Sequence, residues 1–299
     1  MDGPPGMLWG MPRTATGEIE SRLLDAHASC ACYRLSMRIL RLATSDDDSA
    51  RLPPGATAQE AAARVLTEAT GAEVETTVRS PWPDAGLPDL VGRWLDRYEP
   101  DLVLLKVNAF WFNYLSVPLR LERSLGPLGK GIGRAGVRVG ETPWLTRSTV
   151  FRHGRRYLVR IVGGATYFTP EQVVTSMEQC ARRILSCEGT GLLIVGPHSR
   201  LNHELARKAA AAHELRRLHV HNAMKQFSAE MHVPFVGQEV LPTREEVAAM
   251  VGADHLHLGA DAARRGGEEE GAKLLELWRE LHGDLHSSGP ATGGLAPPA

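Results

Sequence analysis

The feature that most constrains the fold is the alternation of short apolar segments with amphipathic helical segments. The runs LVLL at 102–105 and LLIV at 192–195 contain no polar residue. Runs of this length and composition are typical of strands that are buried on both faces of a sheet. Segments with helical periodicity separate these strands along the chain. The alternation therefore predicts an α/β fold with three layers, α/β/α, in which helices cover both faces of a mainly parallel central sheet.

Two of the predicted helices begin with a complete capping box. Thr57 is followed three residues later by Glu60, and Thr169 is followed three residues later by Gln172. In this arrangement each side chain accepts a hydrogen bond from the backbone N–H of the other residue at the helix start. Gly71 is expected to end the first of these helices, because glycine adopts the left-handed backbone conformation that closes many helices.

The same patterns place the other elements and the domain limits. Further helices are expected at 87–99, 202–231 and 268–283, and strands at 37–45, 73–80, 100–110, 191–197 and 233–237. We therefore expect one α/β domain over 37–285. A largely flexible extension over 1–36 precedes it and a disordered tail over 286–299 follows it, because both ends are rich in Gly, Pro and small residues.

A basic, glycine-rich stretch interrupts the alternation at about 120–168. From Arg120 to Arg160 it carries ten basic residues against two acidic ones, Glu122 and Glu141, for a local charge of +8. One interpretation is a solvent-exposed insertion. The other is a lid or partner surface that favours an anionic ligand.

Composition excludes several classes of partner. The formal net charge of −1 gives no reason to expect binding to nucleic acid or to an anionic membrane. No apolar run approaches ~18 residues, so we expect no membrane span, and the start MDGPPGMLWGMPR lacks the pattern of a signal peptide. Four cysteines are too few for a disulfide framework, which favours free thiols in a reducing cytoplasm. The sequence leaves the oligomeric state open.

Two familiar cofactor patterns fail on their context. The GxGxxG match at 131–136 neither follows a predicted strand nor opens a predicted helix, as dinucleotide binding requires. The histidines at 213, 219, 221, 255 and 257 form no local zinc-ligand set. We therefore expect neither a metal ion nor an organic cofactor, and we expect most of the histidines on the long helix to lie at the surface.

The polar stretch GADHLHLGADAA at 252–263 admits three interpretations: a metal site, the acid and base of a catalytic triad, or a polar loop without chemistry. A carboxylate three residues before a histidine, on a loop, can accept a hydrogen bond from its Nδ1–H and stabilise the imidazolium. Asp254 and His257 have this spacing. Such a histidine activates a serine hydroxyl, and Ser45 follows the first predicted strand, with Ser49 as a second choice.

The order of these segments resembles that of the SGNH hydrolases, also called GDSL-type esterases and lipases. The segments ILRLATS, PDLVLLKVN and DHLH carry the resemblance, which covers roughly 37–119 and 169–283. It implies a flavodoxin-like three-layer fold, with Ser45 as nucleophile, His257 as general base and then acid, and Asp254 as the group that orients His257. It requires no cofactor.

The chain departs from the pattern of this family in two places. Ala43-Thr44 stands where the family usually has Gly-Asp before the serine. In the third block, Asn108 falls at the family's glycine and Phe110 at its asparagine. We therefore expect the oxyanion to be held by Asn108, with Gly86 as a further donor and Asn113 in reserve.

The resemblance implies an ester hydrolase that acts on a carboxylic ester, acyl or acetyl, of a small metabolite or sugar. Two alternatives remain open. One is an acyltransferase that uses the same triad, and the other is a catalytically inactive binding or interaction module, which the two departures favour. The aromatic run FWFNY at 110–114 is interpreted either as core or as the lining of an acyl or aryl pocket.

Overall fold

The computed structural model describes residues 36–43, 52–125, 164–199, 207–239, 243–252 and 258–283, together with the single residues 154, 157 and 161. The chain divides into two compact units, Met1–Ser36 and Met37–Ala299, and all elements below belong to the second apart from Ser36 itself. The predicted extension at 1–36, most of the basic stretch and the predicted tail at 286–299 lie outside the described residues, apart from Ser36.

A five-stranded sheet with the order β2-β1-β3-β4-β5 forms the centre of the fold. The pairs β1–β3, β3–β4 and β4–β5 are parallel. The predicted α/β class with a mainly parallel sheet is therefore confirmed. The strands are β1 (Ser36–Leu42), β2 (Glu73–Arg79), β3 (Leu102–Lys106), β4 (Gly191–Val195) and β5 (Phe235–Val236).

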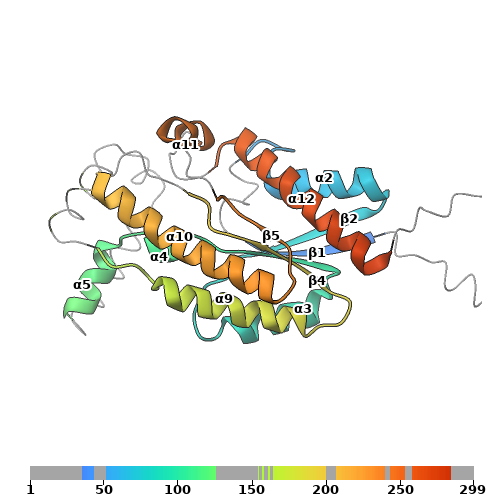
Figure 1. Ribbon diagram of the computed structural model, residues 1–299, viewed down its shortest axis with the longest axis horizontal. Helices are drawn as coiled ribbons and strands as arrows, with labels where there is room; N and C mark the ends of the chain where they lie inside the picture. The colour runs from blue at the N-terminus through green and yellow to red at the C-terminus, as the bar shows by residue number, and fades with distance from the viewer. Residues whose placement is uncertain are drawn as a thin grey trace, which may run out of the picture. The chain divides into compact units, whose positions relative to one another are not determined.

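Helices cover both faces of this sheet, as the alternation predicts. Figure 1 shows α3, α9 and α10 on one face and α2 and α12 on the other. The two buried apolar clusters divide along the same line. The helices are α2 (Ala58–Thr70), α3 (Leu87–Tyr98), α4 (Phe110–Asn113), α5 (Val117–Leu125), α9 (Pro170–Leu185), α10 (Arg207–Glu230), α11 (Arg244–Met250) and α12 (Ala260–His282).

Both predicted capping boxes are confirmed. The Thr57 side chain accepts from the Glu60 backbone N–H, and the Glu60 carboxylate accepts from the Thr57 N–H. Thr169 and Gln172 make the same reciprocal pair. Gly71 ends α2 with a φ of 70°, in the left-handed region where a Cβ would be strained.

Two predicted boundaries are wrong by several residues, one because of packing between helices and one because of a local hydrogen bond. The last helix begins at Ala260 rather than at 268, because its glycine pair is tolerated inside a helix that packs closely on α2. The strand predicted at 100–110 ends at Lys106. Beyond it the Asn108 side chain accepts from the Phe110 N–H, a local bond that turns the backbone into α4.

The two faces of the sheet are filled by alternate residues of the same strands. Leu40, Leu42, Val103 and Leu105 belong to the cluster under α3, α9 and α10, whereas Ile39, Leu102 and Leu104 belong to the cluster under α2 and α12. Because side chains along a strand alternate between the two faces, the same rule assigns a face to Arg41 and Lys106. Arg41 and Lys106 follow Ile39 and Leu104 at alternate positions, so both fall on the face that α12 covers.

Among the described residues no helix combines the length and the apolar character needed to cross a membrane. Cys180 and Cys187 are free thiols, as expected, and burial raises the pKa of Cys180 to about 12. A thiol with this pKa is an inert core residue and not a nucleophile.

Candidate active site

The three predicted triad residues, Ser45, Asp254 and His257, lie outside the described residues. The described residues come close to them in the sequence: Ser45 is two residues beyond Ala43, Asp254 is two residues beyond Gly252, and His257 directly precedes Leu258.

The two helices that follow these segments in the sequence, α2 and α12, pack closely against each other. A Cβ added at Gly267 would lie 2.7 Å from Ala58 Cα and closer still to the Ala58 carbonyl oxygen. One turn later, a Cβ at Gly271 would lie 2.9 Å from Ala62 Cα. The two helices thus run parallel (Figure 1), and the first residue of α2 lies beside Gly267, seven residues into α12.

The described residues on either side of Asp254 and His257 are bonded to each other. Val251 and Leu258 form an isolated antiparallel bridge, and the Gly259 N–H donates to the Met250 carbonyl at 2.8 Å. The helix before them, α11, begins with a third capping box, formed by Thr243 and Glu246.

Asn108 stands at the carboxyl end of β3 with its amide oriented by a local bond. Its Oδ1 accepts from the Phe110 N–H at 2.9 Å, so the amide NH2 is the end that remains to donate. In the register of β1 and β3, Leu42 pairs with Leu105, so the carboxyl ends of these two strands are neighbours in the sheet.

The other two predicted donors make bonds within the protein. Asn113 donates from Nδ2 to the His213 carbonyl at 3.2 Å and accepts at Oδ1 from Arg216 Nε at 3.0 Å. It thereby joins α4 to α10. The Gly86 N–H donates to Asp84 Oδ1 at 2.9 Å at the start of α3. Of the three predicted donors, Asn108 is the one whose donor group makes no such bond among the described residues.

A buried ionic cluster, which the sequence analysis missed, ties together the elements that carry the site. Glu270 of α12 contacts Arg41 Nη2 at 2.6 Å and Lys106 Nζ at 3.4 Å. These three side chains are at most 5% exposed. Arg41 precedes the Ser45 loop and Lys106 precedes Asn108, so one carboxylate fixes both strands to the helix that follows His257. A charged residue within an otherwise apolar strand was the available sequence signal.

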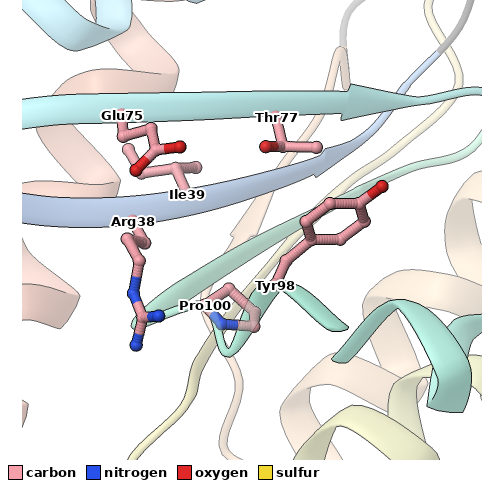
Figure 2. Close-up of a pocket in the computed structure, with 6 residues that line it drawn as sticks. All are labelled: Arg38, Ile39, Glu75, Thr77, Tyr98 and Pro100. Atoms are coloured by element: carbon pink, nitrogen blue, oxygen red, sulfur yellow. The ribbon is translucent and has the colours of Figure 1, made fainter. Parts of the chain in front are cut away.

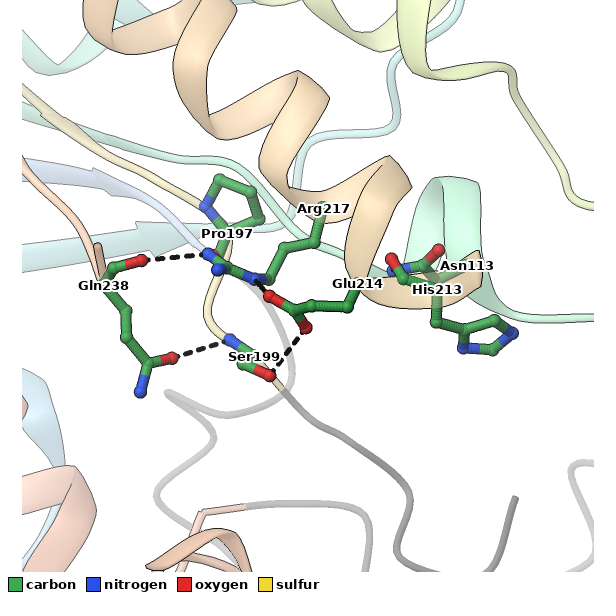
Figure 3. A network of polar contacts seen from close by, with 7 residues as sticks. All are labelled: Asn113, Pro197, Ser199, His213, Glu214, Arg217 and Gln238. Atoms are coloured by element: carbon green, nitrogen blue, oxygen red, sulfur yellow. Dashed lines mark hydrogen bonds and ion pairs between the residues drawn. The ribbon is translucent and has the colours of Figure 1, made fainter. Parts of the chain in front are cut away.

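A second buried network, also missed, joins the ends of β4 and β5 to α10 (Figure 3). Arg217 donates to the carbonyls of Pro197 and Gln238 at 3.1 and 3.0 Å and forms an ion pair with Glu214. Ser199 donates from Oγ to Glu214 at 2.9 Å. Its signal in the sequence is GPHS at 196–199, a polar pair directly after a predicted buried strand.

The aromatic run at 110–114 divides between the two interpretations. Trp111 and Phe112 are buried core residues, whereas Phe110 is 38% exposed. Phe110 packs with Tyr114 and Tyr167 at ring-centroid distances of 4.5 and 5.8 Å, and Trp82, 41% exposed, meets Tyr167 edge-on at 5.1 Å. We call Trp82, Phe110, Tyr114 and Tyr167 the aromatic cluster. It adjoins Asn108, because the Phe110 N–H holds the Asn108 side chain.

The expectation that most α10 histidines lie at the surface is wrong for His221. Its side chain is 2% exposed and packs against Gly196 and Gly237, where an added Cβ would lie 3.2 and 2.7 Å from ring atoms. His213 has a buried Nε2 without a hydrogen-bond partner, while His219 is exposed. Within the described part of the chain, no group of three or more His, Cys, Asp or Glu side chains could hold a metal ion.

Burial gives two of these histidines an acid-sensitive role in stability. It lowers the pKa of His213 to about 4, with a further contribution from Arg216, and it also lowers the pKa of His221, helped by Arg217 and Lys225. Both residues are therefore neutral in the folded protein at pH values where the unfolded chain already binds protons. Their stabilising effect is complete above pH ~6.5 and is lost as the pH falls toward the folded pKa.

We therefore expect the free energy of unfolding to fall between pH 6.5 and 5, with a slope of at most about 1.4 kcal/mol per pH unit for each histidine. Urea titrations across this range measure the slope. His213→Leu should reduce it, whereas His219→Leu, at an exposed site on the same helix, should leave it unchanged. A slope that is equal in all three proteins would contradict the assignment to His213.

A small pocket lies away from this end of the sheet (Figure 2). Arg38, Ile39, Glu75, Thr77, Tyr98 and Pro100 line it. Pro100 precedes β3. Arg38 forms an ion pair with Glu99, and its backbone N–H donates to Asp101 Oδ2 at 2.7 Å. None of the predicted site residues lines this pocket.

Three solved structures of esterases are similar to this chain. Est24, a carbohydrate acetylesterase from Sinorhizobium meliloti, matches 81% of this chain and 99% of its own, at 15% identity and a TM-score of 0.48. The inhibitor-bound aryl esterase of M. smegmatis matches the same shares of the two chains, at 16% identity and a TM-score of 0.45. A family 3 carbohydrate esterase of Clostridium thermocellum matches 83% of this chain and 100% of its own, at 13% and 0.47.

No protein-family model matches the chain, and no curated protein matches it. All three are named as esterases, and at these identities and TM-scores the similarity assigns no reacting side chain.

Proposed function

We propose that the protein is a divergent SGNH-type ester hydrolase that uses Ser45, His257 and Asp254. The observation that carries the proposal is the close parallel contact of α2 with α12 at Gly267 and Ala58. In the sequence Ser45 lies between β1 and α2, Asp254 and His257 lie between β5 and α12, and Asn108 follows β3 by two residues. Because the carboxyl ends of parallel strands lie at one edge of a sheet, the proposal expects a nucleophile, a base with its carboxylate, and an oxyanion donor at that edge.

The proposed reaction proceeds through an acyl-enzyme. His257 takes the proton of the Ser45 hydroxyl while the oxygen attacks the ester carbonyl, and Asp254 stabilises the imidazolium that results. The Asn108 amide and the Ser45 N–H hold the negative oxygen of the tetrahedral intermediate. His257 then gives its proton to the departing alcohol, and a water molecule, activated by the same imidazole, releases the acid.

The substrate we propose is a carboxylic ester, acyl or acetyl, of a small metabolite or sugar. The half-exposed faces of the aromatic cluster beside Asn108 support an apolar or ring-shaped group on one side of the scissile bond. No metal or organic cofactor enters the proposed mechanism.

A fluorophosphonate probe tests the proposal, because it labels a serine only when a neighbouring base activates it. We expect one adduct, mapped by mass spectrometry to Ser45, that persists in Ser49→Ala and disappears in Ser45→Ala. An adduct at Ser49 would show that Ser49, and not Ser45, is the nucleophile. No adduct, together with no turnover of short p-nitrophenyl esters, would favour the non-catalytic binding module instead.

The oxyanion role of Asn108 predicts a defect in catalysis without a defect in folding. Asn108→Asp keeps the Oδ1 that accepts from Phe110 but removes the amide donor. Its kcat should fall by at least about 10²–10³-fold, because the variant loses an oxyanion donor and also places a negative charge beside the developing oxyanion. Steady-state kinetics on p-nitrophenyl acetate measure the effect, and urea unfolding checks that stability is retained. A kcat within a few-fold of the wild-type value would remove Asn108 from the mechanism.

A further inference from the structure

The segment after β4 exposes one side chain between two buried residues. Pro197 and Ser199 are buried, whereas His198 between them is only partly buried. His198 is therefore the residue of this short segment whose side chain is partly accessible from outside.

The Arg217–Glu214 network holds the chain on both sides of His198 (Figure 3). On one side, Arg217 Nη1 donates to the Pro197 carbonyl at 3.1 Å. On the other side, the Ser199 N–H donates to Gln238 Oε1 at 2.9 Å and its hydroxyl donates to Glu214 at 2.9 Å. These bonds hold the backbone on both sides of His198 in place.

Burying the charges of this network costs free energy of desolvation, which indicates a role other than stabilising the fold. Arg217 is 1% exposed and Glu214 is 7% exposed, so both charges are largely removed from water. Burying an ion pair contributes little net stability, because desolvation offsets the attraction. What the pair does supply is a single conformation for the chain ends after β4 and β5.

This segment and the proposed oxyanion donor follow neighbouring strands. Lys106 pairs with Val195 in the parallel register of β3 and β4, and the Val107 N–H donates to the Val195 carbonyl at 2.9 Å. Asn108 and His198 therefore follow the carboxyl ends of β3 and β4 at the same edge of the sheet.

We propose that His198 is a specificity-determining residue that hydrogen-bonds an oxygen on the alcohol part of the ester, and that Glu214 and Arg217 are positioning residues for it. The inference rests on the proposed ester hydrolysis. It implies a substrate whose alcohol carries hydroxyl groups, as a partly acetylated sugar does.

Two acetyl esters test the proposal, because they form the same acetyl-enzyme but release different alcohols. The substrates are p-nitrophenyl acetate and a monoacetylated methyl glucoside with free hydroxyls. In His198→Ala, the ratio of kcat/KM for the sugar ester to that for the nitrophenyl ester should fall about tenfold, through KM, as for the loss of one hydrogen bond. His198→Gln, which keeps a hydrogen-bonding side chain, should recover part of the ratio.

A double-mutant cycle tests the positioning role. Glu214→Gln should lower the same ratio, and combining it with His198→Ala should lower it no further, because both changes remove one contact. Glu230→Gln, at an exposed position on the same helix, is the matched control. Nitrophenyl turnover with an unchanged ratio in His198→Ala would overturn this inference alone. Absence of both turnover and probe labelling would overturn the proposed function and this inference with it.

Discussion

Gly267→Ala should destabilise the protein by about 3 kcal/mol, whereas Gly266→Ala should stabilise it by up to about 1 kcal/mol. The Cβ at 267 would meet the Ala58 backbone, which cannot rotate away as a side chain can, so α2 and α12 must separate. The Cβ at 266 would meet nothing within 4 Å, and alanine is a better helix former than glycine. The two variants differ only in which of two adjacent glycines receives one methyl group.

Urea unfolding followed by circular dichroism measures both changes, which should differ in sign. The same shift should also lower turnover by folded Gly267→Ala, because Ser45 precedes α2 in the sequence and Asp254 and His257 precede α12. Equal stability of the two variants would show that the helices do not make the contact from which the site was inferred.

His257→Ala should lower kcat on p-nitrophenyl acetate by about 10⁴–10⁶-fold, as for the loss of a triad base. His255→Ala should change it by no more than a few-fold, because His255 has no assigned role in the mechanism. The two histidines are two residues apart in the sequence, so a general disturbance of the segment between Val251 and Leu258 would affect both variants alike. Initial rates over a range of substrate concentrations separate kcat from KM.

Asp254→Asn extends this comparison, since it should retain the shape of the loop while losing the charge that orients His257. We expect a loss of about 10⁴-fold. If His255→Ala is the more damaging of the histidine variants, the base is His255 and the spacing argument for Asp254 and His257 fails.

The local elements were predictable because their causes lie within a few residues. The Thr57–Glu60 and Thr169–Gln172 boxes each depend on two side chains three residues apart, and both were confirmed. The strands around 102–106 and 191–195 follow from runs of apolar residues that only the interior of a sheet accommodates.

The candidate site was predictable only in part. The sequence predicts Asn108 near the end of a strand, and the structure has it two residues beyond β3 with its amide oriented. The prediction that His221 lies at the surface is wrong, because helical spacing does not show which face of α10 meets the sheet. Ser45, Asp254 and His257 stay predictions that rest on the sequence and on the positions of their chain neighbours.

What the sequence by itself determined is the α/β alternation, the capped helix starts and the candidate reacting residues, since these depend on neighbours along the chain. The tertiary structure alone decided which of them meet. Arg41 and Glu270 are 229 residues apart and Gly267 meets Ala58 across a similar span. No local pattern encodes such pairs, because each forms only when two separately folded segments bury their surfaces against one sheet.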